Sequence, residues 1–531
     1  MGEFLNRKGS VIFFALLLLI GALIFDDYGV PWDDAHQRNI GLTSYNYVFN
    51  DDDALLSFVD RHYGVGIELP LILIEKAFGL TDSRVIYLTR HLITFLVYFA
   101  SVVVFHRICL RRFGSEGWAL LGSAFLVLSP RIFADAFFNT KDLVFMSAMI
   151  FAAASMLRML DKRTPGAAVL HGLVCAWAIN VRVMAVMIVV FTVFYFAMEL
   201  AIRRPAKREA VAALKHTGLF IAVLAVGTVI QFPYLWDSPV NRFLEVFAGM
   251  SSHPWGGTVL YFGEYISARL RPPFYPITWI CMTTPILYLA AAVVGALKIL
   301  DLTVKDFRLW SNDRNHRNDL IFLACFVSPI IAVIALQSTL YDGWRQLYFV
   351  YPFLLLVSLR GIHFAKEELG RRFPSGARSF SRPLAAGCAA IALSLTTTAF
   401  SMLRNHPHQN VFFNVATPRG DEWLRANFGL DHQGLSYRQA LEFVIATDPS
   451  EDIAVAVPHE PGFLNMMILP AEDRQRIRHV DNVEQADYFI GTYRWKKDGY
   501  PYPNPVHSIV VHGSQIVTVF KLDRAYRRTK N

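Results

Sequence analysis

Uncharged stretches of near-bilayer length recur along most of the chain. The first, residues 11–25, reads VIFFALLLLIGALIF. A helix that crosses a bilayer needs roughly 17–25 mostly apolar residues, and we count about eleven stretches that approach this length. They are residues 11–25, 85–105, 117–128, 143–157, 167–179, 183–202, 217–236, 276–299, 320–337, 346–359 and 384–402. The pattern predicts a polytopic α-helical membrane protein.

One further apolar segment is too short to cross a membrane. Residues 70–80 are interrupted by Glu75 and Lys76. Together with residues 54–60, this segment is expected to form re-entrant or interfacial helices near the membrane surface.

Composition supports the membrane assignment. The 531 residues are 54% hydrophobic and only 18% charged, which is too apolar for an ordinary soluble domain. The net charge of +8 would fit nucleic acid, but the basic residues lie between the apolar stretches, where membrane orientation explains them better. We therefore expect no nucleic-acid partner. The five cysteines lie in or beside apolar stretches without metal-ligand spacing, so no disulfide framework is expected.

Basic residues fall in alternate loops. With the N-terminus in the cytoplasm, the inner loops are rich in Lys and Arg, and the outer loops hold far fewer. The basic loops lie around residues 107–112, 158–163, 203–215, 298–317 and 360–382. With an odd number of spans, the chain from residue 404 onward is expected outside the cytoplasm. We expect a multi-pass membrane protein with a cytoplasmic N-terminus; the location expected for it is a bacterial inner membrane, with the C-terminal domain in the periplasm.

The C-terminal region has a different pattern. Short β-like runs occur at residues 453–457, 488–490 and 508–520, and residues 438–446 resemble a helix. Gly, Pro, Asn and Asp separate them. We predict a transmembrane module over residues 1–403 and a small extracytoplasmic α/β domain over residues 404–531.

Candidate chemistry gathers in the loops expected outside. Carboxylates can act as a general base or hold a divalent metal, whereas Lys and Arg can neutralise a phosphate. The candidates for catalysis are Asp33 and Asp34, and those for substrate binding are Lys141, Arg345, Asp142, His36, Tyr63, Glu68 and His253. Plainer roles are also open: Asp142 is placed to cap a helix, Lys141 to anchor at lipid headgroups, and His253 to lie solvated in a loop.

Several short segments resemble the GT-C glycosyltransferases, in particular the family 39-like protein mannosyltransferases and the aminoarabinose or galacturonic acid transferases. The matching residues are Trp32-Asp33-Asp34-Ala35-His36, Asn139-Thr140-Lys141-Asp142, His406-Pro407-His408-Gln409, Phe412-Phe413-Asn414 and Tyr437-Arg438-Gln439-Ala440. Family members usually have Asp-Glu where this chain has Asp33-Asp34. The Arg-Tyr-Ala-Glu continuation of aminoarabinose transferases is missing.

The resemblance implies a fold, a reaction and partners. A polyprenyl-phosphate sugar would enter from the bilayer, and a lipid, glycan or protein acceptor would come from outside. Asp33 would act as general base in an inverting transfer, while Lys141 and Arg345 would hold the leaving phosphate. A divalent metal that bridges acid and phosphate is left open.

Other functions fit parts of the pattern. A transporter or flippase for a lipid-linked or anionic solute would use the same charges. It should also show an internal repeat or broken mid-membrane helices, and the sequence has no such repeat. A surface-polysaccharide polymerase or ligase and a non-catalytic assembly or receptor protein are the remaining alternatives.

Overall fold

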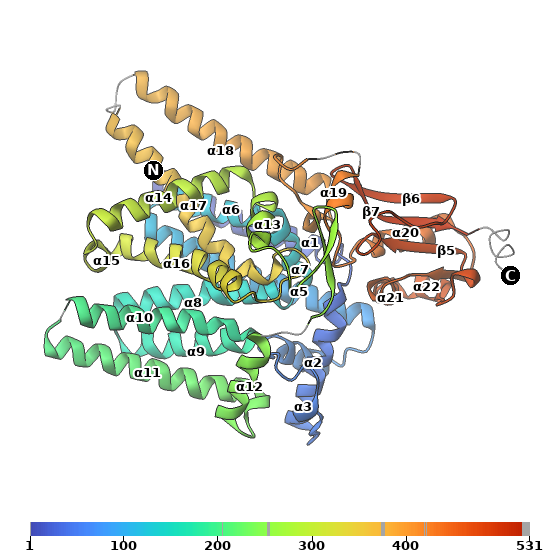
Figure 1. The fold of residues 1–531 in the computed structure, drawn as a ribbon, viewed down its shortest axis with the longest axis horizontal. Helices are drawn as coiled ribbons and strands as arrows, with labels where there is room; N and C mark the ends of the chain where they lie inside the picture. Colours follow the sequence, from blue (N-terminus) through green and yellow to red (C-terminus); the bar gives the residue numbers. More distant parts are fainter. Residues whose placement is uncertain are drawn as a thin grey trace.

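The computed structural model describes residues 2–203, 205–251, 255–372, 378–418, 420 and 422–522. A bundle of long helices occupies most of the molecule, and a small sheet domain lies at one end of it (Figure 1). The N-terminal end of α1 (Gly2–Ile24) lies toward the opposite end of the bundle.

Eight helices among the described residues are long and apolar enough to cross a membrane. They are α5 (Ser83–Phe113), α8 (Asp142–Lys162), α10 (Val186–Arg203), α11 (Lys207–Gln231), α14 (Ile286–Lys305), α16 (Arg314–Ala335), α17 (Tyr351–Arg372) and α18 (Arg378–Arg404). The predicted class of polytopic helical membrane protein is therefore confirmed. Short 3-10 turns precede two of these helices, η1 (Val183–Ala185) before α10 and η3 (Arg345–Val350) before α17.

The remaining predicted stretches are shorter or broken helices. The apolar parts of α1, Lys8–Ile24, and of α9 (Pro165–Val181) fall short of a full span. Helix α6 (Glu116–Val127) bends by 68° into α7 (Pro130–Phe138), because Pro130 cannot continue the hydrogen-bonded ladder. The stretch 276–299 divides at Pro285 into α13 (Tyr275–Thr283) and α14. In the described part of the chain, the eleven predicted stretches thus give eight full spans, or nine if the bent pair is counted as one.

Small residues let two spans approach closely. Gly295 of α14 and Gly361 of α17 face each other, and a Cβ at Gly295 would meet the carbonyl oxygen of Val357 at 2.0 Å. Close backbone contact of this kind is a common way for helices to pack in membranes. It fixes α17, which carries η3 at its start.

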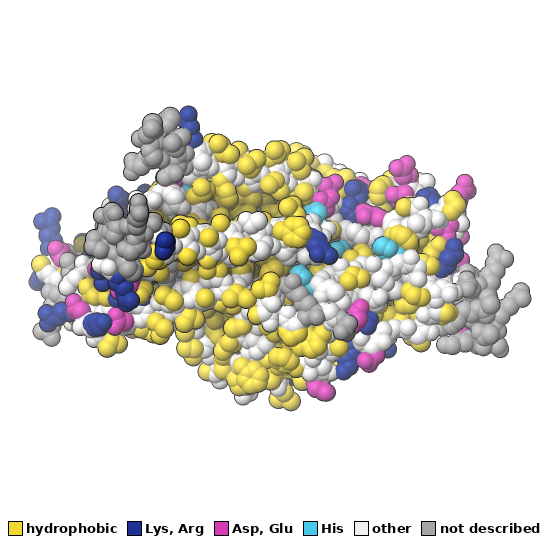
Figure 2. Space-filling model, turned by 90° about the horizontal axis from the view of Figure 1, so that it is seen from above, with side chains coloured by type: hydrophobic (Ala, Val, Ile, Leu, Met, Phe, Trp, Pro, Cys, Tyr) yellow, Lys and Arg dark blue, Asp and Glu magenta, His cyan; other side chains and the backbone are white. Residues whose placement is uncertain are grey.

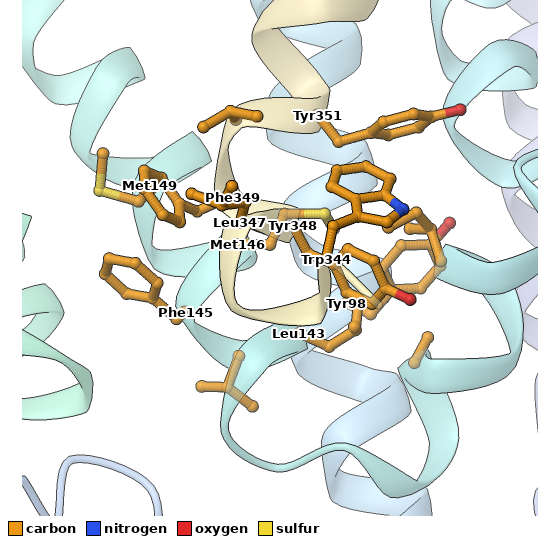
Figure 3. Close-up of a cluster of buried hydrophobic side chains, with 14 of the residues drawn as sticks. Tyr98, Leu143, Phe145, Met146, Met149, Trp344, Leu347, Tyr348, Phe349 and Tyr351 are labelled. Carbon is orange, nitrogen blue, oxygen red and sulfur yellow. The ribbon is translucent and has the colours of Figure 1, made fainter. Parts of the chain in front are cut away.

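An apolar cluster then holds η3 against the start of α8, as Figure 3 shows. Trp344, just before η3, donates a 2.8 Å hydrogen bond from Nε1 to Thr283 Oγ1. Dense packing of this kind leaves little freedom for the polar residues at its edge. The labelled cluster comprises Tyr98, Leu143, Phe145, Met146, Met149, Trp344, Leu347, Tyr348, Phe349 and Tyr351. Arg345 directly follows Trp344 and Asp142 directly precedes Leu143, so the cluster restrains the backbone at both residues.

The first predicted outer loop is mostly helical. It forms α2 (Trp32–Phe49), α3 (Ala54–Ser57) and α4 (Glu68–Ala77), so the short helices expected near residues 54–60 and 70–80 are present. The loop after α11 forms η2 (Pro233–Leu235), α12 (Pro239–Ser251) and the hairpin β1 (Thr258–Tyr261) and β2 (Glu264–Ser267). The loop between α14 and α16 holds the short α15 (Leu309–Asn312).

The C-terminal domain is built on a five-stranded mixed sheet in the order β4-β3-β5-β7-β6. Strand β3 pairs in parallel with β4 and β5, whereas β7 is antiparallel to β5 and β6. The elements are η4 (Gln409–Val411), α19 (Trp423–Asn427), α20 (Tyr437–Thr447), β3 (Ile453–Ala456), α21 (Glu460–Met467), α22 (Ala471–Arg476), β4 (Ile477–His479), η5 (Val483–Gln485), β5 (Tyr488–Thr492), β6 (Pro505–Val511) and β7 (Ser514–Lys521).

One β-like run of the sequence is a hairpin. Residues 508–520 divide between β6 and β7, and His512 and Gly513 form the turn with positive φ of 52° and 79°. Two consecutive residues with positive φ are typical of a tight turn between antiparallel strands.

Figure 2 shows hydrophobic side chains over the middle of the bundle and charged side chains gathered toward its two ends. Unpartnered apolar surface of this extent is costly in water and is expected where lipid covers a protein. The orientation of the two ends relative to the cytoplasm stays a prediction.

Candidate functional site

A cavity of about 390 Å³ lies where α2, the ends of several spans and the C-terminal domain meet. Segments that are far apart in the sequence form its wall. The lining residues are Trp32, Asp33, His36, Gln37, Asp60, Tyr63, Lys141, Trp255, Gly257, Tyr341, Asp342, Arg494 and Trp495. Four of the predicted site residues, Asp33, His36, Tyr63 and Lys141, are therefore brought together.

Asp33 lies in the first turn of α2 and is partly open to the cavity, with 37% of its side chain exposed. Arg345 Nη1 donates a 2.7 Å hydrogen bond to Asp33 Oδ2, and the Arg345 side chain is only 3% exposed. Burial would raise the pKa of Asp33, but the Arg345 guanidinium and the Lys141 ammonium outweigh it and lower the pKa to about 2. Asp33 is thus a carboxylate that is hydrogen-bonded to Arg345 and influenced at longer range by Lys141.

Asp34 points away from the cavity, because neighbouring side chains on a helix diverge by about 100°. It accepts a 2.8 Å hydrogen bond from Nε of Arg90 on α5, and Arg90 Nη2 also bonds Glu68 at 2.7 Å. Burial raises the pKa of Asp34 to about 6, although Arg90 opposes this. Asp34 and Glu68 therefore join α2 and α4 to a span, and neither lines the cavity.

Asp34 does not pair with Arg38, although Arg38 lies four residues further along α2. Arg38 instead pairs with Glu75 of α4, with Nη2 and Oε2 at 2.8 Å. Arg90 lies inside a span and is fully buried, so an unpaired charge there would cost more free energy than one on the partly exposed Arg38.

Lys141 enters the cavity at the mouth of α8. Its Nζ lies 3.6 Å from the centroid of the Tyr63 ring, a cation–π contact. Within the described parts of the chain, no carboxylate oxygen pairs with it within 4.0 Å. Burial and the nearby Arg182 lower the pKa of Lys141 to about 7, against the pull of Asp33 and Asp142. This is the cation best placed to accept an incoming anion.

Asp142 and Arg345 lie behind the cavity wall. Asp142 Oδ2 accepts a 3.0 Å hydrogen bond from Arg345, and its Oδ1 lies 2.6 Å from Arg182 Nη2. Asn139 Oδ1 accepts a 2.7 Å hydrogen bond from the Asp142 N–H at the start of α8, and the N-cap residue, Lys141, makes no side-chain cap hydrogen bond. Asp142 is therefore an ion-pair partner rather than the helix cap.

His36 lies one turn after Asp33 on α2. Its Nε2 is 2.8 Å from Asp60 Oδ2, and this hydrogen bond raises the pKa of His36. His253, the other histidine predicted at the site, lies outside the described residues.

The outer wall comes from the C-terminal domain. Arg494 Nη2 donates to both carboxylate oxygens of Asp342, at 2.8 and 2.9 Å, and its guanidinium lies 5.3 Å from the Trp32 ring centroid. Trp495 lies beside Trp32, with ring centroids 6.0 Å apart. Sequence reasoning missed Arg494 and Trp495, and the only available signal was the run of aromatic and basic residues in the turn after β5.

The C-terminal motifs that carried the resemblance support the segment before Asp33. Tyr28 donates a 3.1 Å hydrogen bond to Gln409 Oε1, and Gln439 Nε2 donates to the carbonyl of Asp27 at 3.0 Å. His406 Nε2 lies 2.7 Å from Asp27 Oδ2. These contacts fix residues 27–31 and so set where α2 begins.

Within the described ranges, no group of three or more His, Cys, Asp or Glu side chains is arranged to hold a metal ion. The cavity instead combines a carboxylate, a cation without a paired carboxylate, and aromatic walls. Such a site can hold an anionic group, pack against a ring with an apolar face and accept a proton.

Residues 80–232 match the family model of the dolichyl-phosphate-mannose-protein mannosyltransferases. The matched segment runs from the start of α5 to the end of α11 and contains Lys141 and Asp142. The resemblance to this group of membrane glycosyltransferases is thus confirmed over that segment. No protein among curated sequences matches the chain.

Solved structures of similar arrangement are distant in sequence. ArnT from Cupriavidus metallidurans in the apo state has 14% identity and a TM-score of 0.43, over 97% of this chain and 98% of that one. The same protein bound to undecaprenyl phosphate has 13% identity and a TM-score of 0.39, over 96% and 98%. An Archaeoglobus fulgidus oligosaccharyltransferase has 11% identity and a TM-score of 0.47, over 90% and 68%.

Proposed function

We propose that this protein is a membrane glycosyltransferase. It moves a sugar from a polyprenyl-phosphate donor to a lipid, glycan or protein acceptor on the membrane face that carries the C-terminal domain. The observation that carries the proposal is that Asp33 and Lys141 line one cavity at the ends of membrane helices. The family match over residues 80–232 supports the same reaction class. A bacterial inner membrane, with this face toward the periplasm, is the location that fits such a donor.

In the proposed reaction an acceptor hydroxyl or amine attacks the anomeric carbon. The bond from that carbon to the donor phosphate oxygen breaks, and its electron pair leaves with the polyprenyl phosphate. The acceptor proton passes to Asp33. Attack from the face opposite the leaving group inverts the anomeric centre.

The lysine and arginine of the predicted phosphate clamp take different roles. Lys141 lines the cavity and has no paired carboxylate among the residues that the structure describes, so it supports the leaving phosphate by charge-assisted hydrogen bonding. Arg345 does not line the cavity and is held by Asp33 and Asp142. In this proposal Arg345 orients the base.

The aromatic walls support a sugar as the transferred group. Trp255 and Tyr341 stack with ring centroids 4.3 Å apart, Trp32 and Trp495 lie 6.0 Å apart, and all four rings line the cavity. Rings of this kind present apolar faces, while Asp342 and Arg494 supply polar atoms to orient hydroxyl groups.

The test is mass analysis of envelope glycans and lipids from cells with and without the chain, with Asp33→Asn as the matched inactive form. We expect one sugar-bearing species to disappear in the deletion, return with the wild type and stay absent with Asp33→Asn. Identical profiles in deleted and complemented cells would refute the glycosyltransferase. A profile restored by Asp33→Asn would refute only the choice of base.

A further inference from the structure

Arg345 is shared by three carboxylates, of which Asp142 also pairs with Arg182 and Asp342 also pairs with Arg494. Its guanidinium lies 2.7 Å from Asp33, 3.0 Å from Asp142 and 3.6 Å from Asp342. One nitrogen, Nη1, donates to both Asp33 and Asp142, while Nε makes no hydrogen bond to any described residue. The guanidinium is buried, so these interactions act in a medium of low dielectric.

Lys141 belongs to the same charge cluster. It precedes Asp142 in the chain, and it and Arg345 are the two strongest cationic influences on Asp33. Lys141 lies near two carboxylates, Asp33 and Asp142, and of these two Asp33 alone lines the cavity. Asp33 therefore lies between the cavity and Arg345.

An anion that enters next to Lys141 must therefore compete with Asp33. A donor phosphate beside Lys141 would therefore draw on cations that already act on the carboxylate that must accept a proton. A carboxylate that is hydrogen-bonded to one cation and influenced by a second is a weak base, and it becomes a stronger one when another anion takes part of their charge.

We propose that the donor phosphate and Asp33 share Lys141 and Arg345, so that binding of the donor turns Asp33 into an effective base. This inference rests on the proposed function. Arg345 is then a positioning residue that moves its main interaction away from Asp33 when the site is loaded. In the empty site the carboxylate is held, which protects the cavity from proton transfer without a donor.

Coupling between two sites is reciprocal. If phosphate weakens the hold on Asp33, then the charge of Asp33 must weaken phosphate binding. Removal of that charge should strengthen binding of a bare polyprenyl phosphate, even though it abolishes transfer. Asp33→Asn is nearly isosteric, so it changes the charge and leaves the shape.

The experiment measures the affinity of undecaprenyl phosphate for the full chain in lipid nanodiscs, for wild type, Asp33→Asn and Asp33→Ser. We expect both variants to bind about five- to tenfold more tightly, the size of a carboxylate–phosphate repulsion across a partly hydrated site. Two different substitutions are used so that poor folding of one variant does not decide the result. The thermal unfolding temperature of each variant is measured in the same samples.

Asp452→Asn is the control. This substitution removes the same charge, but Asp452 lies outside the cavity, in an exposed pair with Arg478. We expect its affinity for undecaprenyl phosphate to stay within twofold of wild type. An equal gain in Asp452→Asn would overturn the sharing of two particular cations and point to a general effect of net charge. Unchanged or weaker binding in both Asp33 variants would overturn the inference while leaving the proposed function intact. A wild type that does not bind undecaprenyl phosphate would overturn both.

Discussion

Arg494 of the C-terminal domain donates hydrogen bonds of 2.8 and 2.9 Å to the two carboxylate oxygens of Asp342, which lies 152 positions earlier in the chain. Asp342 is three residues before Arg345, so this pair places the outer domain against the polypeptide that holds Asp33. Lys497 adds a second attachment: its backbone N–H donates a 3.1 Å hydrogen bond to Tyr265 on β2. The C-terminal domain is therefore part of the cavity rather than an appendage.

Replacement of Arg494 by Ala should impair transfer. Loss of charge-assisted hydrogen bonds costs about 1.5–3 kcal/mol, and Asp342 would be left buried beside the cavity. We expect transfer to fall at least about tenfold while undecaprenyl phosphate still binds, because Lys141 lies in a different wall. The measurement is initial transfer rate together with lipid-phosphate affinity.

Arg478→Ala is the control for Arg494→Ala. Arg478 is on the same domain, and its pair with Asp452 is exposed on both sides, so its removal should change little. Normal transfer by Arg494→Ala, or equal loss by both variants, would contradict a role of Arg494 at the cavity.

Replacement of Lys141 by Ala should weaken capture of the donor phosphate. We expect the affinity for undecaprenyl phosphate to fall about tenfold or more, in line with loss of a charge-assisted contact to an anion. Thermal stability should stay close to wild type, because Lys141 has no carboxylate partner within 4.0 Å among the described residues. Unchanged affinity would remove Lys141 from the site.

The pH dependence of that binding follows from Lys141. Burial lowers its pKa to about 7, so in the empty site the ammonium is lost as pH rises through 7. A phosphate ester is already mostly doubly charged above pH 7, so affinity should fall between pH 7 and 9. Lys141→Arg keeps its charge throughout this range and should flatten the profile. A wild-type profile as flat as that of Lys141→Arg would contradict the assignment.

Much of this site could be predicted from sequence, and the reason is electrostatic. Polar and charged side chains near the hydrocarbon of a membrane carry a free-energy cost, so their presence at the ends of apolar spans suggests a function. This argument predicts four residues of the site: Asp33, His36, Tyr63 and Lys141. The fold class, a polytopic helical membrane protein, can also be predicted from sequence, because apolar stretches of near-bilayer length make up most of the chain. The break at Pro285, in contrast, required attention to a single residue inside an apolar run.

Long-range pairing could not be predicted. A spacing of four residues places Arg38 on the same helix face as Asp34, yet Asp34 pairs with Arg90, 56 positions away, because an unpaired charge costs more free energy inside the protein. Arg494 reaches the cavity only because a separately folded sheet docks there. Neither the Arg90–Asp34 pair nor the position of Arg494 can be predicted from neighbouring residues in the sequence, because both depend on how distant elements pack.

Replacement of Arg90 by Met should be the most destabilising of these changes. Arg90 is fully buried and binds both Asp34 and Glu68, so its loss leaves two buried carboxylates uncompensated. Removal of one partner from a buried ion pair costs about 3–5 kcal/mol. We expect low yield and a large drop in the thermal unfolding temperature in detergent. A variant as stable as wild type would show that this network does not hold α2 to α5.

Asp34→Asn is the comparison for Arg90→Met, and it has a distinct pH signature. Burial raises the pKa of Asp34 to about 6, above the value near 3.9 of an unfolded chain. The folded state therefore holds this proton more tightly, so the associated stability is present below about pH 4 and is lost as pH rises through about 6. Asp34→Asn should remove this part of the pH dependence while the protein still folds.

The last prediction concerns which face of the membrane carries the cavity. Basic loops lie at one end of the bundle and the C-terminal domain at the other, so the positive-inside rule places that domain outside the cytoplasm (Figures 1 and 2). A reporter active only in the cytoplasm, fused after Asn531, should be silent, and one active only outside should report. The control is the same pair of reporters fused after Lys305, at the end of α14 in a basic loop, where the outcome should be the opposite. A cytoplasmic signal from Asn531 together with an outside signal from Lys305 would invert the molecule. The cavity would then face the cytoplasm, and the acceptor would have to be sought there.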